Sequence, residues 1–281
     1  MAEPELAPAT SAGDPHPLDL ATRLVDDGGP GMLGHTHPAY GNMVGPFGGV
    51  IAAALLNAPM THRTRLGDPV ALTVNFAGPV AEGPFRVHAR AVRTNRSTQH
   101  WSIELDQQSQ VCATATAVFA TRRDTWSSTE IGFPAPPPAA DVQPSGPLEF
   151  AVWTRRYEMR FVLGGPPDFS SPDRETGSIS SLWIRDEPPR PLDFVSLAAI
   201  CDAFFPRIFQ RRPRWTPAGT VSLTTYFHAD AGALAAQGAR PVFGAARAQH
   251  FGRGYFDQTA EVWGDDGALL ATSHQIVYYK E

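Results

Sequence analysis

The sequence predicts an α+β protein in which two tandem antiparallel sheets each wrap a central helix. The main observation is an internal repeat, because an apolar helical segment accompanied by alternating β-branched segments occurs once in each half of the chain. A Pro-rich stretch separates the two halves. The chain has 281 residues, of which 42% are hydrophobic and 18% are charged. A chain of this size buries about 75% of the surface that its unfolded form exposes, so it can fold without disulfides or a metal.

The first half is expected to contain one helix and four strands. Residues 48–57 (GGVIAAALLN) form the helix, because they carry no charge and are rich in Ala and Leu. Alternating, β-branched segments follow it at 70–76, 85–92, 100–106 and 111–121. A helix with apolar residues on nearly every side belongs in a core, and a long antiparallel sheet is a natural cover for it.

The second half repeats this arrangement around a second apolar helix. The helix is predicted at 192–205 (LDFVSLAAICDAFF), where Pro206 ends or kinks it. Strands accompany it at 157–163, 181–185, 220–227, 242–250, 255–263 and 268–279. The sequence Gly-Asp-Asp-Gly at 264–267 joins the last two strands as a hairpin, since glycine accepts positive φ.

The repeat sets the expected domain boundaries. Residues 126–150 form a Pro-rich linker between an N-terminal unit at 18–125 and a C-terminal unit at 151–281. The acidic, Pro-rich residues 1–17 are expected to be a disordered tail. One helix wrapped by one antiparallel sheet, occurring twice, is the pattern of a double hotdog fold. An unrelated pair of α+β domains would give the same periodicity.

Composition excludes several classes of function. The net charge of −5 leaves no overall basic face for general nucleic-acid binding. Cys112 and Cys201 are the only cysteines and lie far apart, which argues against a disulfide framework or a Cys-based zinc site. Lys280 is the only lysine, which argues against Schiff-base and P-loop chemistry. No apolar run reaches the ~18 residues of a membrane span and no signal-peptide pattern opens the chain, so a cytoplasmic protein is expected.

Short motifs in a fixed order carry a further signal. The first half has Gly-Pro-Phe-Gly-Gly-Val at 45–50. The second half has, in series, EMR at 158–160, LWIR at 182–185, AICD at 199–202, YFH at 226–228, GRG at 252–254 and LLATSHQ at 269–275. In this order and spacing the motifs resemble the acyl-CoA thioesterase II family, the double-hotdog thioesterases. The resemblance covers nearly the whole chain after Leu18, although Val50 stands where Gln is common in the family.

The resemblance implies a catalytic trio of an Asp, a Thr or Ser, and a Gln. It places the trio at Asp202, Thr220 and Gln275, with Ser222 as the alternative hydroxyl on the same strand face. Asp202 also stands among apolar residues of 197–205, where desolvation raises the pKa of a carboxyl and suits it to act as a general base. A buried structural carboxyl that only accepts hydrogen bonds would fit the same segment.

The start of the first-half helix offers donors for an oxyanion. Gly48 and Gly49 permit close approach of the backbone, and their N–H groups are free at the helix N-terminus. Tight packing of helix on sheet would explain the same glycines. Superposing the two halves places Asn57 and Ala117 where the second half has its Asp and Gln. The first half has therefore lost the trio, and one working site per chain is expected.

The implied activity is that of an acyl-CoA thioesterase, which hydrolyses fatty acyl-CoA to a free fatty acid and CoA through an activated water. Such hydrolysis needs no metal and no other cofactor. A non-catalytic acyl-CoA or lipid-binding hotdog protein would show the same pattern, and a hotdog enoyl-CoA hydratase is a further alternative. Phe204, Phe205 and Phe209 could line an acyl tunnel or belong to the core.

The densest basic cluster of the chain is a candidate binding site for CoA. Arg207, Arg211, Arg212 and Arg214 surround Trp215. Guanidinium groups and an indole could hold the phosphates and adenine of CoA. A solvated helix C-terminus with favourable positive charge explains the same residues equally simply.

Metal binding and assembly are the remaining expectations. His35 and His37 are the best candidate metal ligands, but no acidic residue stands near them in sequence, so no metal site is expected. The family resemblance implies that such chains pair through their sheets. A homodimer or a larger even-numbered assembly is therefore expected rather than a monomer.

Overall fold

The computed structural model describes residues 14–170 and 176–281. Residues 1–13 of the expected N-terminal tail lie outside the described residues. His16 already belongs to the folded part. Its Nδ1 accepts a hydrogen bond from the amide of Leu18 at the start of helix α1 (Pro17–Ala21), and its Nε2 contacts the carbonyl of Pro188. The folded part therefore begins before Leu18.

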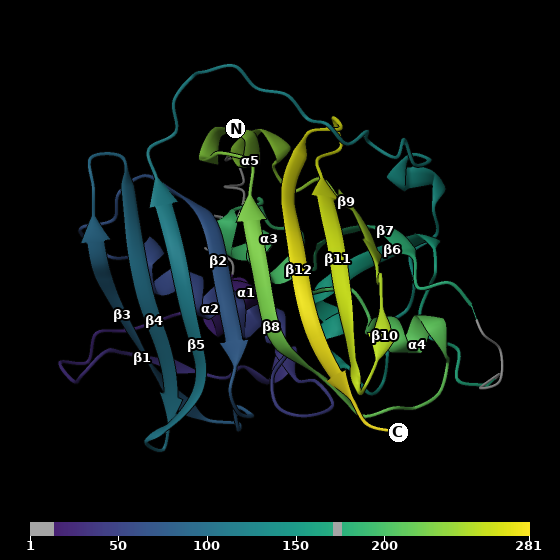
Figure 1. Cartoon of the computed structure of the whole chain (residues 1–281), viewed down its shortest axis with the longest axis horizontal. Helices are drawn as coiled ribbons and strands as arrows, with labels where there is room; N and C mark the ends of the chain where they lie inside the picture. Colours follow the sequence, from purple (N-terminus) through teal and green to yellow (C-terminus); the bar gives the residue numbers. More distant parts are fainter. Residues whose placement is uncertain (1–13, 171–175) are drawn as a thin grey trace, which may run out of the picture.

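One large antiparallel sheet forms the body of the protein (Figure 1). Its strands lie in the order β1 (Met32–His35), β3 (Pro84–Thr94), β4 (Thr98–Gln107), β5 (Gln110–Ala120), β2 (Asp68–Phe76), β8 (Ala218–Phe227), β12 (Leu269–Tyr279), β11 (Tyr255–Trp263), β9 (Val242–Arg247), β7 (Ser180–Asp186) and β6 (Tyr157–Leu163). The short strand β10 (Phe251–Gly252) pairs with β11. The two predicted sheets join edge to edge, because β2 of the first half pairs with β8 of the second.

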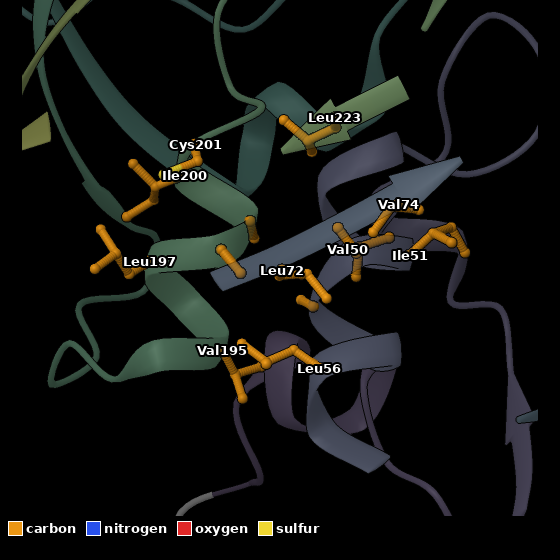
Figure 2. Close-up of a cluster of buried hydrophobic side chains, with 14 of the residues drawn as sticks. Val50, Ile51, Leu56, Leu72, Val74, Val195, Leu197, Ile200, Cys201 and Leu223 are labelled. Carbon is orange, nitrogen blue, oxygen red and sulfur yellow. The ribbon is translucent and has the colours of Figure 1, made fainter. Parts of the chain in front are cut away.

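Two central helices, α2 (Gly48–Met60) and α3 (Phe194–Ile200), lie on one face of this sheet and pack against each other (Figure 1). Figure 2 shows side chains of both helices, Val50 and Val195 among them, meeting Leu72 and Leu223 of the central strands. Burial of each such side chain stabilises the fold by about 1.5–3 kcal/mol. The predicted α+β class, with a helix covered by antiparallel strands in each half, is confirmed.

Short helices complete the described chain. They are α1, α4 (Arg207–Arg211), α5 (Ala231–Gln237) and the 3₁₀ helices η1 (Pro38–Tyr40), η2 (Ala139–Asp141) and η3 (Val152–Arg156). Within residues 14–170 and 176–281, no helix has the length and apolar character needed to cross a membrane.

The second central helix is shorter than the sequence predicts. The expected helix spans 192–205, whereas α3 begins after Asp193, whose carboxylate caps the amide of Ser196, and ends at Ile200. Cys201 is the C-cap of α3 and stands five residues before Pro206, so the proline does not set the end of this helix as the sequence predicts. Asp202 consequently lies in the turn that follows α3, with its amide donating to the carbonyl of Ala199 at 3.1 Å.

One predicted strand of the second half is also shorter than expected. The sequence predicts a strand at 242–250, but β9 ends at Arg247. The Asp257 carboxylate accepts hydrogen bonds from the amides of Gln249 and His250, and these bonds hold the chain in a turn. The turn leads into the separate strand β10.

The Pro-rich linker packs against the outer face of the second half. Strand β7 alternates, so that Leu182 belongs to the helix-facing core while Trp183 lies with Phe243 and Trp263 in a second cluster. Phe133 of the linker lies 6.0 Å from Phe243 and 5.7 Å from Trp263, measured between ring centroids. The indole N–H of Trp183 donates to the carbonyl of Pro137 at 2.8 Å. The linker therefore covers apolar sheet surface that would otherwise face water.

Candidate functional site

Asp202 lies between the ends of the two central helices. It follows α3, and its carboxylate reaches the first residue of α2. A Cβ atom added to Gly48 would lie 2.8 Å from Asp202 Oδ2, so a larger residue there would displace the carboxylate. The backbone N–H of Gly49 also interacts with the carboxylate and favours its charged form. The helix start therefore supports the carboxylate directly.

The three residues of the predicted trio meet in one hydrogen-bond chain. Gln275 Nε2 of β12 donates to Asp202 Oδ1 at 2.8 Å. Thr220 Oγ1 of β8 donates to Gln275 Oε1 at 3.2 Å. Each amide atom of Gln275 thus has a defined partner, and this fixes the orientation of its side chain. The chain brings together residues that are 55 and 73 positions apart in sequence.

A β-bulge separates the two candidate hydroxyls. Ser222 pairs with Ile276 and Thr220 pairs with Val277, so Val221 is an extra residue in β8. Paired residues lie on the same face of a sheet. Val277 is buried like Gln275, whereas Ile276 is 45% exposed. Thr220 therefore faces the helices and Ser222 the opposite side, which corrects the expectation that both share one face.

Burial dominates the electrostatics of Asp202. Asp202 is partly buried, and desolvation raises the pKa of its carboxyl from 3.8 to about 7. Hydrogen bonds from the Gln275 amide and the Gly49 backbone oppose this shift. Near neutral pH the group therefore exists in both protonation states, which is the condition that a general base requires.

The glycine pair has a different arrangement from the one predicted. The Gly49 N–H interacts with the Asp202 carboxylate and lowers the pKa of that carboxyl, whereas the sequence predicts that it faces an oxyanion. A Cβ on Gly49 would lie 2.6 Å from the carbonyl oxygen of Ala199 and 2.5 Å from the ring of Phe47. Gly49 thus allows α2 to approach α3 closely, while Gly48 borders the site.

All three trio residues line a cavity of about 490 Å³. Its walls are largely apolar and include Phe204, Phe205 and Phe209, which the sequence left open as tunnel or core residues. These side chains are also almost completely buried, so they belong to the core and to the cavity wall together. A concave, mostly apolar space with a few convergent polar groups is typical of a site for a small organic ligand.

Sequence reasoning missed polar residues of this cavity, among them Asn42 and Gln258. Gln258 of β11 lines the cavity directly opposite Gln275 on the neighbouring strand. Strand alternation could have found it, since Phe256, Gln258 and Ala260 share the buried face of β11 and Gln258 is the polar exception.

The basic cluster divides into a buried and an outer part. Arg207 is buried; its guanidinium donates to the carbonyls of Phe205 and Ser178 and to the hydroxyl of Ser180. Desolvation lowers the Arg207 pKa to about 9, so the group stays charged at neutral pH. The sequence analysis expected Arg207 to belong to a basic surface cluster. The structure corrects this expectation, because Arg207 is buried.

The outer part follows α4. Arg211 and Arg212 are partly exposed, Arg214 is exposed, and Arg212 pairs with Glu281 near the C-terminus. The Trp215 ring stacks on Phe209, which lines the cavity, with 6.1 Å between centroids. The outer arginines thus lie close to one wall of the cavity.

The remaining candidates have local roles. Asn57, at the position equivalent to the second-half Asp, donates from Nδ2 to the carbonyl of Thr22 at 2.9 Å. His35 Nδ1 contacts the carbonyl of Thr36, and His37 Nδ1 accepts the amide of Ala39. No group of three or more His, Cys, Asp or Glu in the described part of the chain is arranged to hold a metal ion.

Comparisons with known proteins agree on the fold. Two family models match, described as the acyl-CoA thioesterase N-terminal domain over residues 37–120 and the C-terminal domain over residues 133–279. A solved hot dog fold protein of unknown function from Alicyclobacillus acidocaldarius is 46% identical, with a TM-score of 0.90 over 95% of this chain and 99% of that chain. A search of curated proteins finds no match.

More distant solved structures share the same architecture. A putative thioesterase II from Thermobifida fusca is 20% identical, with a TM-score of 0.78 over 94% of this chain and 97% of that chain. The tesB protein of Mycobacterium avium subs paratuberculosis is 16% identical, with a TM-score of 0.74 over 94% and 98%. The predicted hotdog fold is confirmed.

Proposed function

Because the chain belongs to the acyl-CoA thioesterase family, we propose that it hydrolyses fatty acyl-CoA to a free fatty acid and CoA. The observation that carries this proposal is the hydrogen-bond chain of Asp202, Gln275 and Thr220 on the wall of an apolar cavity. Thioester hydrolysis needs a base for water and polar groups that hold this water against the carbonyl carbon. The three side chains supply these groups.

The reaction follows from the protonation states of these groups. The ionised Asp202 takes a proton from a water whose oxygen adds to the thioester carbonyl carbon. The tetrahedral oxyanion then collapses, the C–S bond breaks, and the leaving CoA sulfur receives the proton from Asp202. Gln275 and Thr220 orient the water. We assign an oxyanion donor to the Gly48 N–H, because the first amide of a helix lacks an intrahelical acceptor and Gly48 lines the cavity.

The pH profile tests the assignment of the base. Only ionised Asp202 accepts a proton, and its pKa is raised to about 7. We therefore expect kcat/KM to rise about tenfold per pH unit below this value and to level off above it. Stopped-time assays from pH 5 to 9 would measure this rise. A plateau that extends down to pH 5 would mean that the active base has an ordinary carboxyl pKa.

The two hydroxyls of β8 give a matched pair of variants. Thr220→Ala removes the hydrogen bond to Gln275 Oε1, and we expect kcat to fall about tenfold, the equivalent of about 1.4 kcal/mol. Ser222→Ala changes the opposite face of the same strand and should leave kcat within about twofold. A larger fall in kcat from Ser222→Ala than from Thr220→Ala would show that Ser222 is the catalytic hydroxyl.

Gln275→Ala should lower kcat less than a variant that removes the base does.

We assign CoA binding to Arg211, Arg212 and Arg214 beside Trp215, because a basic segment next to an aromatic wall suits phosphates and adenine. Replacing the three arginines by glutamine should raise KM for acyl-CoA about tenfold with little change in kcat. Acyl-pantetheine lacks the nucleotide, so its KM should not respond. An equal rise in KM for both substrates would show that the arginines do not bind the nucleotide part of CoA.

A thiol-release assay with acyl-CoAs of graded chain length tests the function itself. We expect turnover with at least one chain length. Tight binding of acyl-CoA with no release of thiol from any substrate would instead select the alternative of a non-catalytic acyl-CoA or lipid-binding protein. The cytoplasmic location and the even-numbered assembly remain predictions from the sequence.

A further inference from the structure

Gln258 is the one buried glutamine of the described chain whose amide nitrogen has no partner. It is 2% exposed, and its Nε2 makes no hydrogen bond with any described residue. The other buried glutamines all donate through Nε2: Gln99 to Thr64, Gln107 to Ala81, Gln210 to Gly165, Gln237 to Arg240 and Gln275 to Asp202. A buried donor without a partner costs about 1–3 kcal/mol.

The strand itself gives no reason for a polar residue at this position. The neighbours of Gln258 on the buried face of β11 are Phe256 and Ala260, and both pack in apolar surroundings. An aliphatic side chain would fit that face without the cost of an unpaired amide. Because Gln258 also lines the cavity, its unpaired amide points to a partner that binds there.

The position of Gln258 identifies what this partner must be. Gln258 stands directly opposite Gln275 in the β11 and β12 pairing, and both side chains line the same cavity. Side chains that face each other in this way lie about 4.5–5.5 Å apart at Cβ. Gln258 therefore adjoins the group that orients the water in the proposed reaction.

Two of the donors beside the water already bond to the protein, and the Gly48 N–H is left for the oxyanion. Gln275 Nε2 is bonded to Asp202, and the Gly49 amide is directed at the same carboxylate. An acyl-CoA brings one polar atom next to the attacking water, namely the oxygen of its thioester carbonyl. This oxygen gains negative charge in the transition state and then accepts hydrogen bonds more strongly.

We propose that Gln258 is a further catalytic residue, whose carboxamide N–H donates to the acyl carbonyl oxygen and stabilises the oxyanion together with the helix start at Gly48. This inference rests on the proposed thioesterase function. Gln258 thereby acts on the substrate oxygen, while Gln275 acts on the water.

Gln258→Met tests the role, because Met has a similar length and volume but no donor. We expect kcat/KM to fall about 10- to 100-fold, mostly through kcat, while Tm stays equal or rises since the unpaired amide is gone. Gln237→Met is the matched control. It removes a buried amide that is bonded to Arg240 and Pro241 outside the cavity, so Tm should fall and kcat should persist.

A spectroscopic readout separates substrate contact from a structural effect. With ¹³C-labelled thioester carbonyl bound to Asp202→Asn, infrared difference spectra should show the carbonyl stretch moved to lower frequency. Adding Gln258→Met should reverse part of this shift. Wild-type turnover together with unchanged kcat/KM and an unchanged carbonyl frequency in the Gln258 variants would overturn the inference and leave the thioesterase function standing. If the wild-type protein releases no thiol from any acyl-CoA, both the role of Gln258 and the thioesterase function are overturned.

Discussion

Replacing Asp202 by Asn is expected to lower kcat about 10²-fold or more in the thiol-release assay, because the variant lacks the proposed general base. The protein should remain folded, since Asn has the shape of Asp and the hydrogen-bond chain can invert. The Asn oxygen would accept from the Gly49 amide, and its nitrogen would donate to a flipped Gln275. The Thr220 hydroxyl would then accept from Gln275. Equal activity in the variant would remove Asp202 from the mechanism.

Stability provides the control for this variant. The folded protein raises the pKa of Asp202 from 3.8 to about 7, so between these pH values the folded state binds a proton that the unfolded state has released. The contribution of this group to stability is therefore present below pH 4 and is lost as pH rises to 7. The Asn side chain does not titrate, so the stability of the variant has no such decrease between pH 4 and 7. We expect the variant to match or exceed the wild-type Tm at pH 8, and its advantage to shrink toward pH 5.

Gly49→Ala is expected to have the largest effect on folding. The new Cβ would lie 2.6 Å from the Ala199 carbonyl oxygen, and this backbone atom moves only if α2 and α3 separate. Overpacking of this kind costs about 3 kcal/mol, or about 5–10 °C in Tm. The Gly49 amide would also move away from the Asp202 carboxylate, so the rise of activity with pH should shift to higher pH.

Gly232→Ala is the matched control, because Gly232 is also the second residue of a helix. A Cβ there meets only Asp230 Oδ1, at 3.3 Å. Alanine is favoured over glycine inside helices by about 0.5–1 kcal/mol, so Tm should stay equal or rise. A similar loss of Tm in both variants would show that close packing of the central helices is not what Gly49 provides.

Local sequence patterns predict the two central helices and most of the strands, but not β1, β10 or the short helices α1, α4 and α5, and the proposed trio comes from the family resemblance. The start of α2 and the hairpin before β12 are predicted by residues that lie next to each other in sequence. The choice of Thr220 over Ser222 depends on a bulge at Val221, which is set by pairing with a strand distant in sequence. Period-2 alternation alone predicts the same face for both hydroxyls.

Burial of polar residues was the least predictable feature. Arg207 stands beside three other arginines in sequence and looks like part of a charged surface, yet it is fully buried among carbonyl and hydroxyl acceptors. Strand alternation marks Gln258 as a polar residue on a buried face, but its place beside Gln275 depends on which strands become neighbours. Single-sequence periodicity does not contain that information.

The central claim is direct attack of water activated by Asp202, and a single turnover in H₂¹⁸O tests it most directly. With enzyme in excess over acyl-CoA, the account predicts that the released fatty acid carries one ¹⁸O atom and that the peptide containing Asp202 carries none. Unlabelled fatty acid with ¹⁸O in the Asp202 carboxyl would mean that the carboxylate attacks the thioester itself, and would contradict the account.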